Sequence, residues 1–128
     1  MTEYIKATSC IRRRSDLSVE EFTEYWTKTH GPLVISVAEA LGAKRYVQNH
    51  LLPGAMTDAF KETRCGNVEP YDGVVEVWFD AADTDMNEAR LEAMLALLHD
   101  EPNFIDMENS AWFFTVEHVV IALSLIHI

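Results

Sequence analysis

The sequence predicts an α+β fold of the ferredoxin-like type, a four-stranded antiparallel sheet with helices on one face. Segments that alternate with a period of two are interspersed with segments of helical period, in the order strand, helix, strand, strand, helix, strand. Two right-handed crossovers in that βαββαβ order arrange the strands as 4-1-3-2, so that the third strand lies between the first and the second.

The first half of the chain contains a strand followed by a well-marked helix start. Residues 4–11 alternate and form the expected strand. Ser18 is the expected N-cap, and Glu21, three residues later, completes a capping box; Leu17 and Phe22 form a hydrophobic staple around it. The buried stripe of this helix is expected to be Phe22, Tyr25, Trp26 and Thr29.

The segment KTHGPLV, residues 28–34, should separate two helices. Gly31 is expected to end the first helix and Pro32 to begin the second, which Gly42 would cap. His30 is not needed for that boundary. It therefore either packs as a cap on a carbonyl of the last turn or takes part in chemistry, as a cation favoured at a helix C-terminus.

The remaining elements follow from the same periodicities. The expected segments are strands at 44–52, 72–80 and 112–123, a helix at 85–99, a helical turn near 58–63 and a short turn from Pro102 through Asp106. The apolar stripe of the 85–99 helix is expected to consist of Leu91, Met94, Leu95 and Leu98.

One face of this sheet has no helix to cover it. That face is expected to expose Trp78, Tyr46 and several residues of the last strand. An apolar patch of this size on a soluble protein is typical of an interface, so the sequence predicts a homodimer with the two sheets packed face to face.

The composition of the chain argues against several classes of function. The chain has 128 residues and a net charge of −11; residues 1–64 hold 9 basic and 8 acidic side chains, whereas residues 65–128 hold 1 and 13. Such an acidic surface argues against nucleic-acid or anionic-lipid partners and is typical of a solvated face. Two cysteines without a signal peptide indicate free thiols in a cytoplasmic protein, and no apolar run is long enough to span a membrane.

Four segments together resemble the EthD family, over roughly residues 4 to 121. They are RRRSDLSVEEFTEYWTKTHGPLV, RYVQNH, YDGVVEVWFD and FIDMENSAWFFTVEHVV, and the most specific part is the helix that runs into His-Gly-Pro-Leu. The resemblance implies a dimeric α+β barrel with a pocket inside it or between sheet and helices. Similar small proteins include decarboxylases of polyketide acids and isomerases of methylmuconolactone, and others of the superfamily cyclise polyketides or bind haem.

Polar residues on neighbouring strands form the predicted site. Tyr46, Gln48 and His50 share one strand face, and Glu76, Trp78 and Lys6 are expected beside them on adjacent strands. In this hypothesis His50 is the general base, oriented by Glu76, and Tyr46 donates a hydrogen bond to an enolate. His30 is a second acid or a carboxylate anchor. Gln48, Trp78, Trp26 and Lys6 are the expected substrate-binding residues.

These residues favour a lyase or isomerase that acts without a cofactor on an aromatic, polyketide-like or lactone substrate. Two alternatives stay open: a non-catalytic dimeric module that binds a hydrophobic metabolite through a polar network, and a haem protein with His118 as axial ligand. Related isomerases use a cysteine, but Cys65 is expected to be a buried spectator thiol. The scattered histidines, His99 among them, lack the spacing of a zinc site.

The expected domain organisation is one domain over residues 1–122. Residues 123–128 form an apolar tail beyond the resemblance, and this tail could either lengthen the last strand or be non-native sequence.

Overall fold

The structure, a computed structural model, describes residues 3–123, so the expected tail lies, apart from Leu123, outside the described residues. Its antiparallel sheet has the order β2-β3-β1-β4, which is the predicted order read from the other edge. The strands are β1 (Tyr4–Ile11), β2 (Ala43–His50), β3 (Gly73–Asp80) and β4 (Ala111–Thr115). The helices are α1 (Val19–Tyr25), a π-helical turn η1 (Trp26–His30), α2 (Gly31–Leu41), α3 (Ala55–Thr63), α4 (Glu88–Asp100) and the 3-10 turn η2 (Glu101–Asn103).

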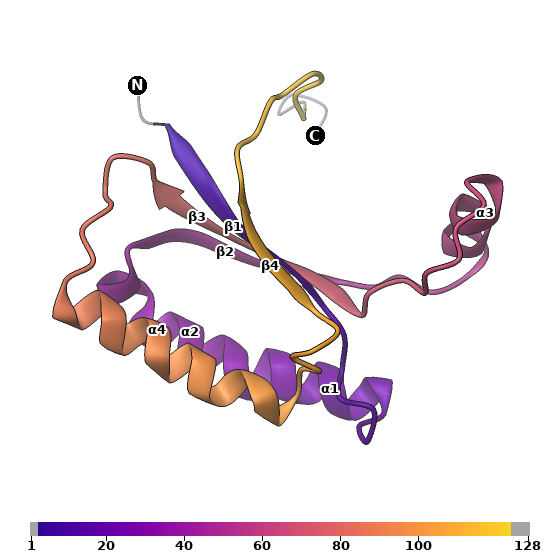
Figure 1. The fold of residues 1–128 in the computed structure, drawn as a ribbon, viewed down its shortest axis with the longest axis horizontal. Helices are drawn as coiled ribbons and strands as arrows, with labels where there is room; N and C mark the ends of the chain where they lie inside the picture. Colours follow the sequence, from indigo (N-terminus) through magenta and orange to yellow (C-terminus); the bar gives the residue numbers. More distant parts are fainter. Residues whose placement is uncertain (1–2, 124–128) are drawn as a thin grey trace.

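The helices form one layer against the sheet. Figure 1 shows α1, α2 and α4 on the same side of the strands, whereas α3 projects beyond one end of the sheet. The ferredoxin-like α+β fold predicted from the sequence is therefore confirmed. Among residues 3–123, none of the helices has the length and apolar character needed to cross a membrane.

The predicted helix start at Ser18 is present in full. The Ser18 hydroxyl accepts a hydrogen bond from the backbone N–H of Glu21, and the Glu21 carboxylate accepts one from the backbone N–H of Ser18. Leu17 packs against the buried cluster that contains Phe22, as the predicted staple requires. Of the expected stripe, Phe22 and Trp26 are buried, but Thr29 is exposed.

Gly31 does not end the helix, contrary to the expectation. Its φ and ψ of −54° and −53° are helical, and its N–H donates to the carbonyl of Trp26 five residues back. The helix thus continues through the wider π-turn, which accommodates Pro32 because proline has no N–H that needs an acceptor. Gly42, with a φ of 83°, caps α2 as predicted.

Two other boundaries differ from the prediction. The helix α3 begins at Ala55 and runs for nine residues, more than the single turn expected. The strand β4 ends at Thr115 instead of continuing to residue 123. Thr115 pairs with Lys6 and β1 begins at Tyr4, so the sheet offers almost no backbone for a longer β4 to pair with.

The apolar stripe predicted on α4 is not packed. Its four residues are half exposed, at 44–61%, and the buried positions of the helix are instead Arg90 and Ala93. These four side chains face a space between α4 and the sheet. The stripe was correctly identified, but it lines a cavity.

Contacts at two ends hold the helix layer in place, at one end through the sheet residue Ile11 and at the other through Arg90. At one end, Ile11, Phe22, Trp26, Phe104 and Ile105 form the buried cluster. At the other end Arg90, 7% exposed, donates through Nε to the Leu41 carbonyl at 3.0 Å and through Nη2 to Oδ2 of Asp83 at 2.8 Å. The guanidinium therefore links the C-terminal end of α2 to the start of α4.

Gly73 lets the Trp26 indole lie directly on β3. A Cβ atom at position 73 would be 2.6 Å from Cζ3 of Trp26 and 2.9 Å from the Asn49 carbonyl oxygen.

We expect Gly73→Ala to lower the free energy of unfolding by about 1–3 kcal/mol, measured by urea denaturation, because the indole must move. Gly31→Ala is the matched control: its nearest non-local atoms are at 3.5 Å, so it should be neutral or stabilising by up to about 1 kcal/mol. Equal effects of the two substitutions would contradict this account.

Candidate functional site

Strand register divides the predicted site between two faces of the sheet. Glu76 pairs with Val47 on β2, and because successive side chains alternate, Tyr46 points to the opposite face from Glu76. Tyr46 lies toward the helices and lines the space between helices and sheet. The placement of Tyr46 on the uncovered face was therefore wrong, as was its grouping with Glu76.

The expected pair between Glu76 and His50 is not formed, for the same reason. Glu76 instead accepts hydrogen bonds from Lys6 Nζ at 2.5 Å and from Asn49 Nδ2 at 3.0 Å. The Lys6 hydrogen bond is the main cause that lowers the pKa of the Glu76 carboxyl. His50 is exposed and stacks on the Trp26 indole, with ring centroids 4.3 Å apart.

The sheet face away from the helices, which we call the open face, carries the other predicted residues. Lys6 Nζ lies 4.9 Å from the centre of the Trp78 ring, and the Arg45 guanidinium lies 4.6 Å from it. The Trp78 indole N–H donates to Glu117 at 3.3 Å. Lys6, Glu76 and Trp78 thus form a polar network that is separate from Tyr46, Gln48 and His50.

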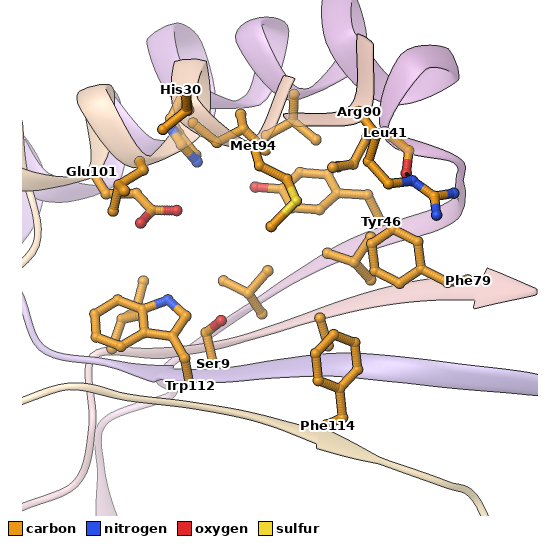
Figure 2. Close-up of a pocket in the computed structure, with 18 of the residues that line it drawn as sticks. Ser9, His30, Leu41, Tyr46, Phe79, Arg90, Met94, Glu101, Trp112 and Phe114 are labelled. Atoms are coloured by element: carbon orange, nitrogen blue, oxygen red, sulfur yellow. Dashed lines mark hydrogen bonds between the residues drawn. The ribbon is translucent and has the colours of Figure 1, made fainter. Parts of the chain in front are cut away.

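A cavity of about 570 Å³ lies between the sheet and the helix layer. Its walls are mostly aliphatic and aromatic, from all four strands and from α2 and α4. The few polar side chains along it include Ser9, His30, Tyr46, Arg90 and Glu101 (Figure 2). An apolar cavity with a small number of polar groups is the usual form of a small-molecule site.

His30 enters this cavity from the π-turn. The residue is 6% exposed, and its Nδ1 lies 2.8 Å from Oδ2 of Asp100 at the end of α4. The other Asp100 oxygen accepts the Tyr25 hydroxyl at 2.5 Å. Burial opposes ionisation of Asp100, but hydrogen bonds from Tyr25, His30 and Asn103 outweigh it and lower the pKa of the carboxyl. An ionised Asp100 keeps the proton of the ring on Nδ1 and leaves Nε2 for the cavity.

The interaction that holds the His30 side chain differs from the one expected from the sequence. The helix does not end there, so its dipole does not hold the imidazole, and no last-turn carbonyl is capped by it. The Asp100 carboxylate holds the ring instead. Sequence reasoning missed Asp100 because the two residues are 70 positions apart and no local pattern links them.

Tyr46 presents its phenol to the same cavity. Gln48 Nε2 donates to the phenol oxygen at 2.8 Å and to the Trp26 carbonyl at 2.9 Å, which fixes the ring against the π-turn. Burial raises the pKa of Tyr46, and the Gln48 amide and the Trp26 indole reduce that effect. Since the phenol oxygen already accepts from Gln48, its own O–H is available to a ligand.

Two further groups belong to residues that line the cavity. Nε1 of Trp26 is buried and, although the indole acts on the Tyr46 phenol, it meets no acceptor at full hydrogen-bond geometry within residues 3–123. Glu101, directly after α4, points its carboxyl into the cavity near His30 (Figure 2). Burial and, after it, the neighbouring Asp100 charge raise the pKa of Glu101 to about 7. A signal for Glu101 existed in the sequence, since it follows Leu98 by three residues in line with the apolar stripe of α4.

The remaining candidates lie elsewhere. Cys65 is exposed just after α3, so the expectation that it is buried was wrong, and Cys10 is half-buried in β1. His99 and His118 are exposed, and neither lines the cavity. Within residues 3–123, no cluster of three or more His, Cys, Asp or Glu side chains could hold a metal ion.

Solved structures with the same fold were found for nearly the whole chain. An ethyl tert-butyl ether D (EthD) family protein from Bacillus halodurans C-125 has a TM-score of 0.58 at 18% identity, over 92% of this chain and 100% of its own. An EthD-like protein from Ralstonia eutropha JMP134 has a TM-score of 0.55 at 18% identity, over 97% of this chain and 98% of its own. At these identities the likeness shows the fold alone. No functionally curated protein matches the chain.

The sequence itself matches the EthD domain family over residues 14–108. This range contains the helix start at Ser18, the His-Gly-Pro segment and the dyad of His30 with Asp100. The match covers most of the chain, and the protein belongs to the EthD family.

Proposed function

We propose that this EthD-family protein binds a small, mostly apolar carbonyl compound in its cavity and catalyses a proton transfer on it without a cofactor. The observation that carries the proposal is the His30–Asp100 pair, at 2.8 Å, facing one apolar cavity together with the Tyr46 phenol. An imidazole oriented by a carboxylate is a general base, and a phenol in a dry site stabilises an oxyanion.

The three groups support a simple sequence of steps. His30 Nε2 takes a proton from a carbon beside the carbonyl, and the electrons of that C–H bond form the double bond of an enolate. The enolate oxygen accepts a hydrogen bond from Tyr46. Return of the proton to a different carbon completes an isomerisation. In a cyclisation the enolate carbon instead attacks a second carbonyl carbon of the substrate, whose oxygen takes the proton from His30.

His30 thereby takes the base role that the sequence suggested for His50. The supporting difference is position: His30 is buried beside the cavity, whereas His50 is exposed and stacked on Trp26. Gln48 and Trp26 act as positioning residues, since the first holds the Tyr46 phenol and the second supplies the carbonyl that Gln48 binds.

The test uses a probe ketone, 2-tetralone, because exchange of its α-hydrogens in D₂O reports proton abstraction directly by NMR. We expect the protein to accelerate exchange and His30→Gln to reduce that acceleration about a hundredfold, the range of a lost general base. Asp100→Asn should lower it as well, because the amide leaves Nδ1–H without its charged partner. Tyr46→Phe should lower it about tenfold.

His99→Gln is the matched control, since His99 is exposed on α4, and it should leave exchange unchanged. Exchange that is equally fast with and without the protein, despite saturable binding of 2-tetralone, would refute the catalytic proposal. That result would assign the protein to the other class considered for the sequence, a module that binds a hydrophobic metabolite.

We further propose that a second copy covers the open face of the sheet. The supporting observations are that the helices lie on the other face and that apolar side chains remain exposed on and beyond β4, including Phe113 at 47% and Val116 at 72%. Apolar surface of this extent is typical of an interface.

Light scattering coupled to gel filtration tests this assembly. The unmodified protein should elute with twice the mass of one chain, and Phe113→Lys should shift it to the monomer, because a charge replaces an apolar contact on the open face. Phe60→Lys, at a phenylalanine that is also exposed but lies on the projecting α3, is the control and should leave the dimer intact. A monomeric unmodified protein, or dissociation by both substitutions, would contradict the proposed face.

A further inference from the structure

The cavity has an uneven distribution of charge that bears on which ligands it accepts. The acidic groups close to its His30 end are Asp100 and Glu101. The basic residues along its described walls are His30 and Arg90. No lysine lines it within residues 3–123.

Arg90 is already occupied by the protein. Its Nε, Nη1 and Nη2 atoms donate to the carbonyl oxygens of Leu41, Asp83 and Asp85 and to the Asp83 carboxylate, at 2.8–3.0 Å. The Asp83 carboxylate also neutralises its charge. A ligand carboxylate in the cavity would therefore meet no free guanidinium, and the His30 imidazole already faces the Asp100 carboxylate. Burying such an anion without a cation of its own is costly.

Glu101 differs from the other cavity carboxylates because it has no partner. Among the described residues, no side-chain hydrogen bond reaches its carboxyl, which points into the space between the helix layer and the sheet (Figure 2). A carboxyl in such surroundings favours its neutral form, and a neutral carboxyl can donate a hydrogen bond. The pKa of about 7, raised first by burial and then by Asp100, agrees with this geometry.

Building on the proposed function, we infer that Glu101 is a specificity-determining acid, which donates a hydrogen bond to an uncharged carbonyl or hydroxyl oxygen of the ligand and excludes carboxylate ligands. The substrate class is accordingly a neutral ketone or lactone. Protonated Glu101 donates a hydrogen bond to the ligand oxygen, whereas ionised Glu101 repels electron-rich groups.

Other titratable groups lie around Glu101, and their effects on the pH dependence of binding must be distinguished from the effect of Glu101. His30 from the π-turn and Tyr46 from β2 line the same cavity, and Asp100 precedes Glu101 in the chain. Arg14 lies outside, where its guanidinium donates to the carbonyl oxygens of Pro102 and Asn103. A variant at position 101 alone distinguishes Glu101 from these groups.

The experiment measures dissociation constants by quenching of tryptophan fluorescence, with calorimetry as a check, for two probes that share one bicyclic carbon frame. The probes are 2-tetralone, which stays neutral, and tetrahydro-2-naphthoate, which is an anion at both test values, pH 6 and pH 8.5. We expect the unmodified protein to bind 2-tetralone about tenfold more weakly at pH 8.5 than at pH 6, with a midpoint near 7, as Glu101 loses its proton. The anion should bind at least about tenfold more weakly than the ketone at pH 8.5.

Glu101→Gln keeps the size and a hydrogen-bond donor but cannot titrate, so its affinity for 2-tetralone should be independent of pH. Glu92→Gln, on the exposed side of α4, is the matched control and should retain the pH dependence. Circular dichroism at both pH values verifies that each variant is folded.

The outcomes separate this inference from the proposed function. A pH dependence that persists in Glu101→Gln, or an anion that binds as tightly as the ketone, overturns the role of Glu101 and leaves the proton-transfer proposal standing. Saturable, Glu101-dependent binding without α-hydrogen exchange overturns the proton-transfer proposal alone. Absence of any saturable binding of 2-tetralone overturns both.

Discussion

The position of Trp26 is the constraint on which the rest of the site depends. Its indole lies on Gly73 of β3, and its carbonyl accepts both the N–H of Gly31 and the amide of Gln48. One residue therefore joins the π-turn to two strands. The same contacts bring the His30 ring to the cavity from one layer and hold the Tyr46 phenol there from the other.

The cavity exists because the helix layer is fastened at its ends and not along its length. The buried aromatic cluster around Phe22 and Phe104 holds one end, and the Arg90 hydrogen bonds hold the other. Between them the apolar side chains of α4 remain half exposed to the internal space. Apolar surface left uncovered in this way is unfavourable for stability, as is common where a site must stay open for a ligand.

Local sequence signals predicted local structure well and long-range pairing poorly. The capping box at Ser18 and the cap at Gly42 follow from residues within one turn, so the sequence contains all the information needed. The face on which Tyr46 lies depends on strand register, including an irregularity between Ala43 and Arg45, and a shift of one residue reverses every side chain. The contact of His30 with Asp100 depends on how α4 lies against the π-turn, which no periodicity encodes.

Asp100 and Glu101 show how one helix end can supply two carboxyls with different chemistry. Three hydrogen bonds lower the pKa of Asp100 despite its burial, whereas Glu101 has apolar surroundings and a negative neighbour, and its pKa rises to about 7. The first effect contributes to the second, because ionised Asp100 disfavours a second adjacent charge. Groups whose environments separate their pKa values in this way can act as an anionic partner and a neutral acid at one pH. Here the charged Asp100 carboxylate orients the His30 imidazole, and under the proposed function the neutral Glu101 carboxyl is the one that faces the ligand.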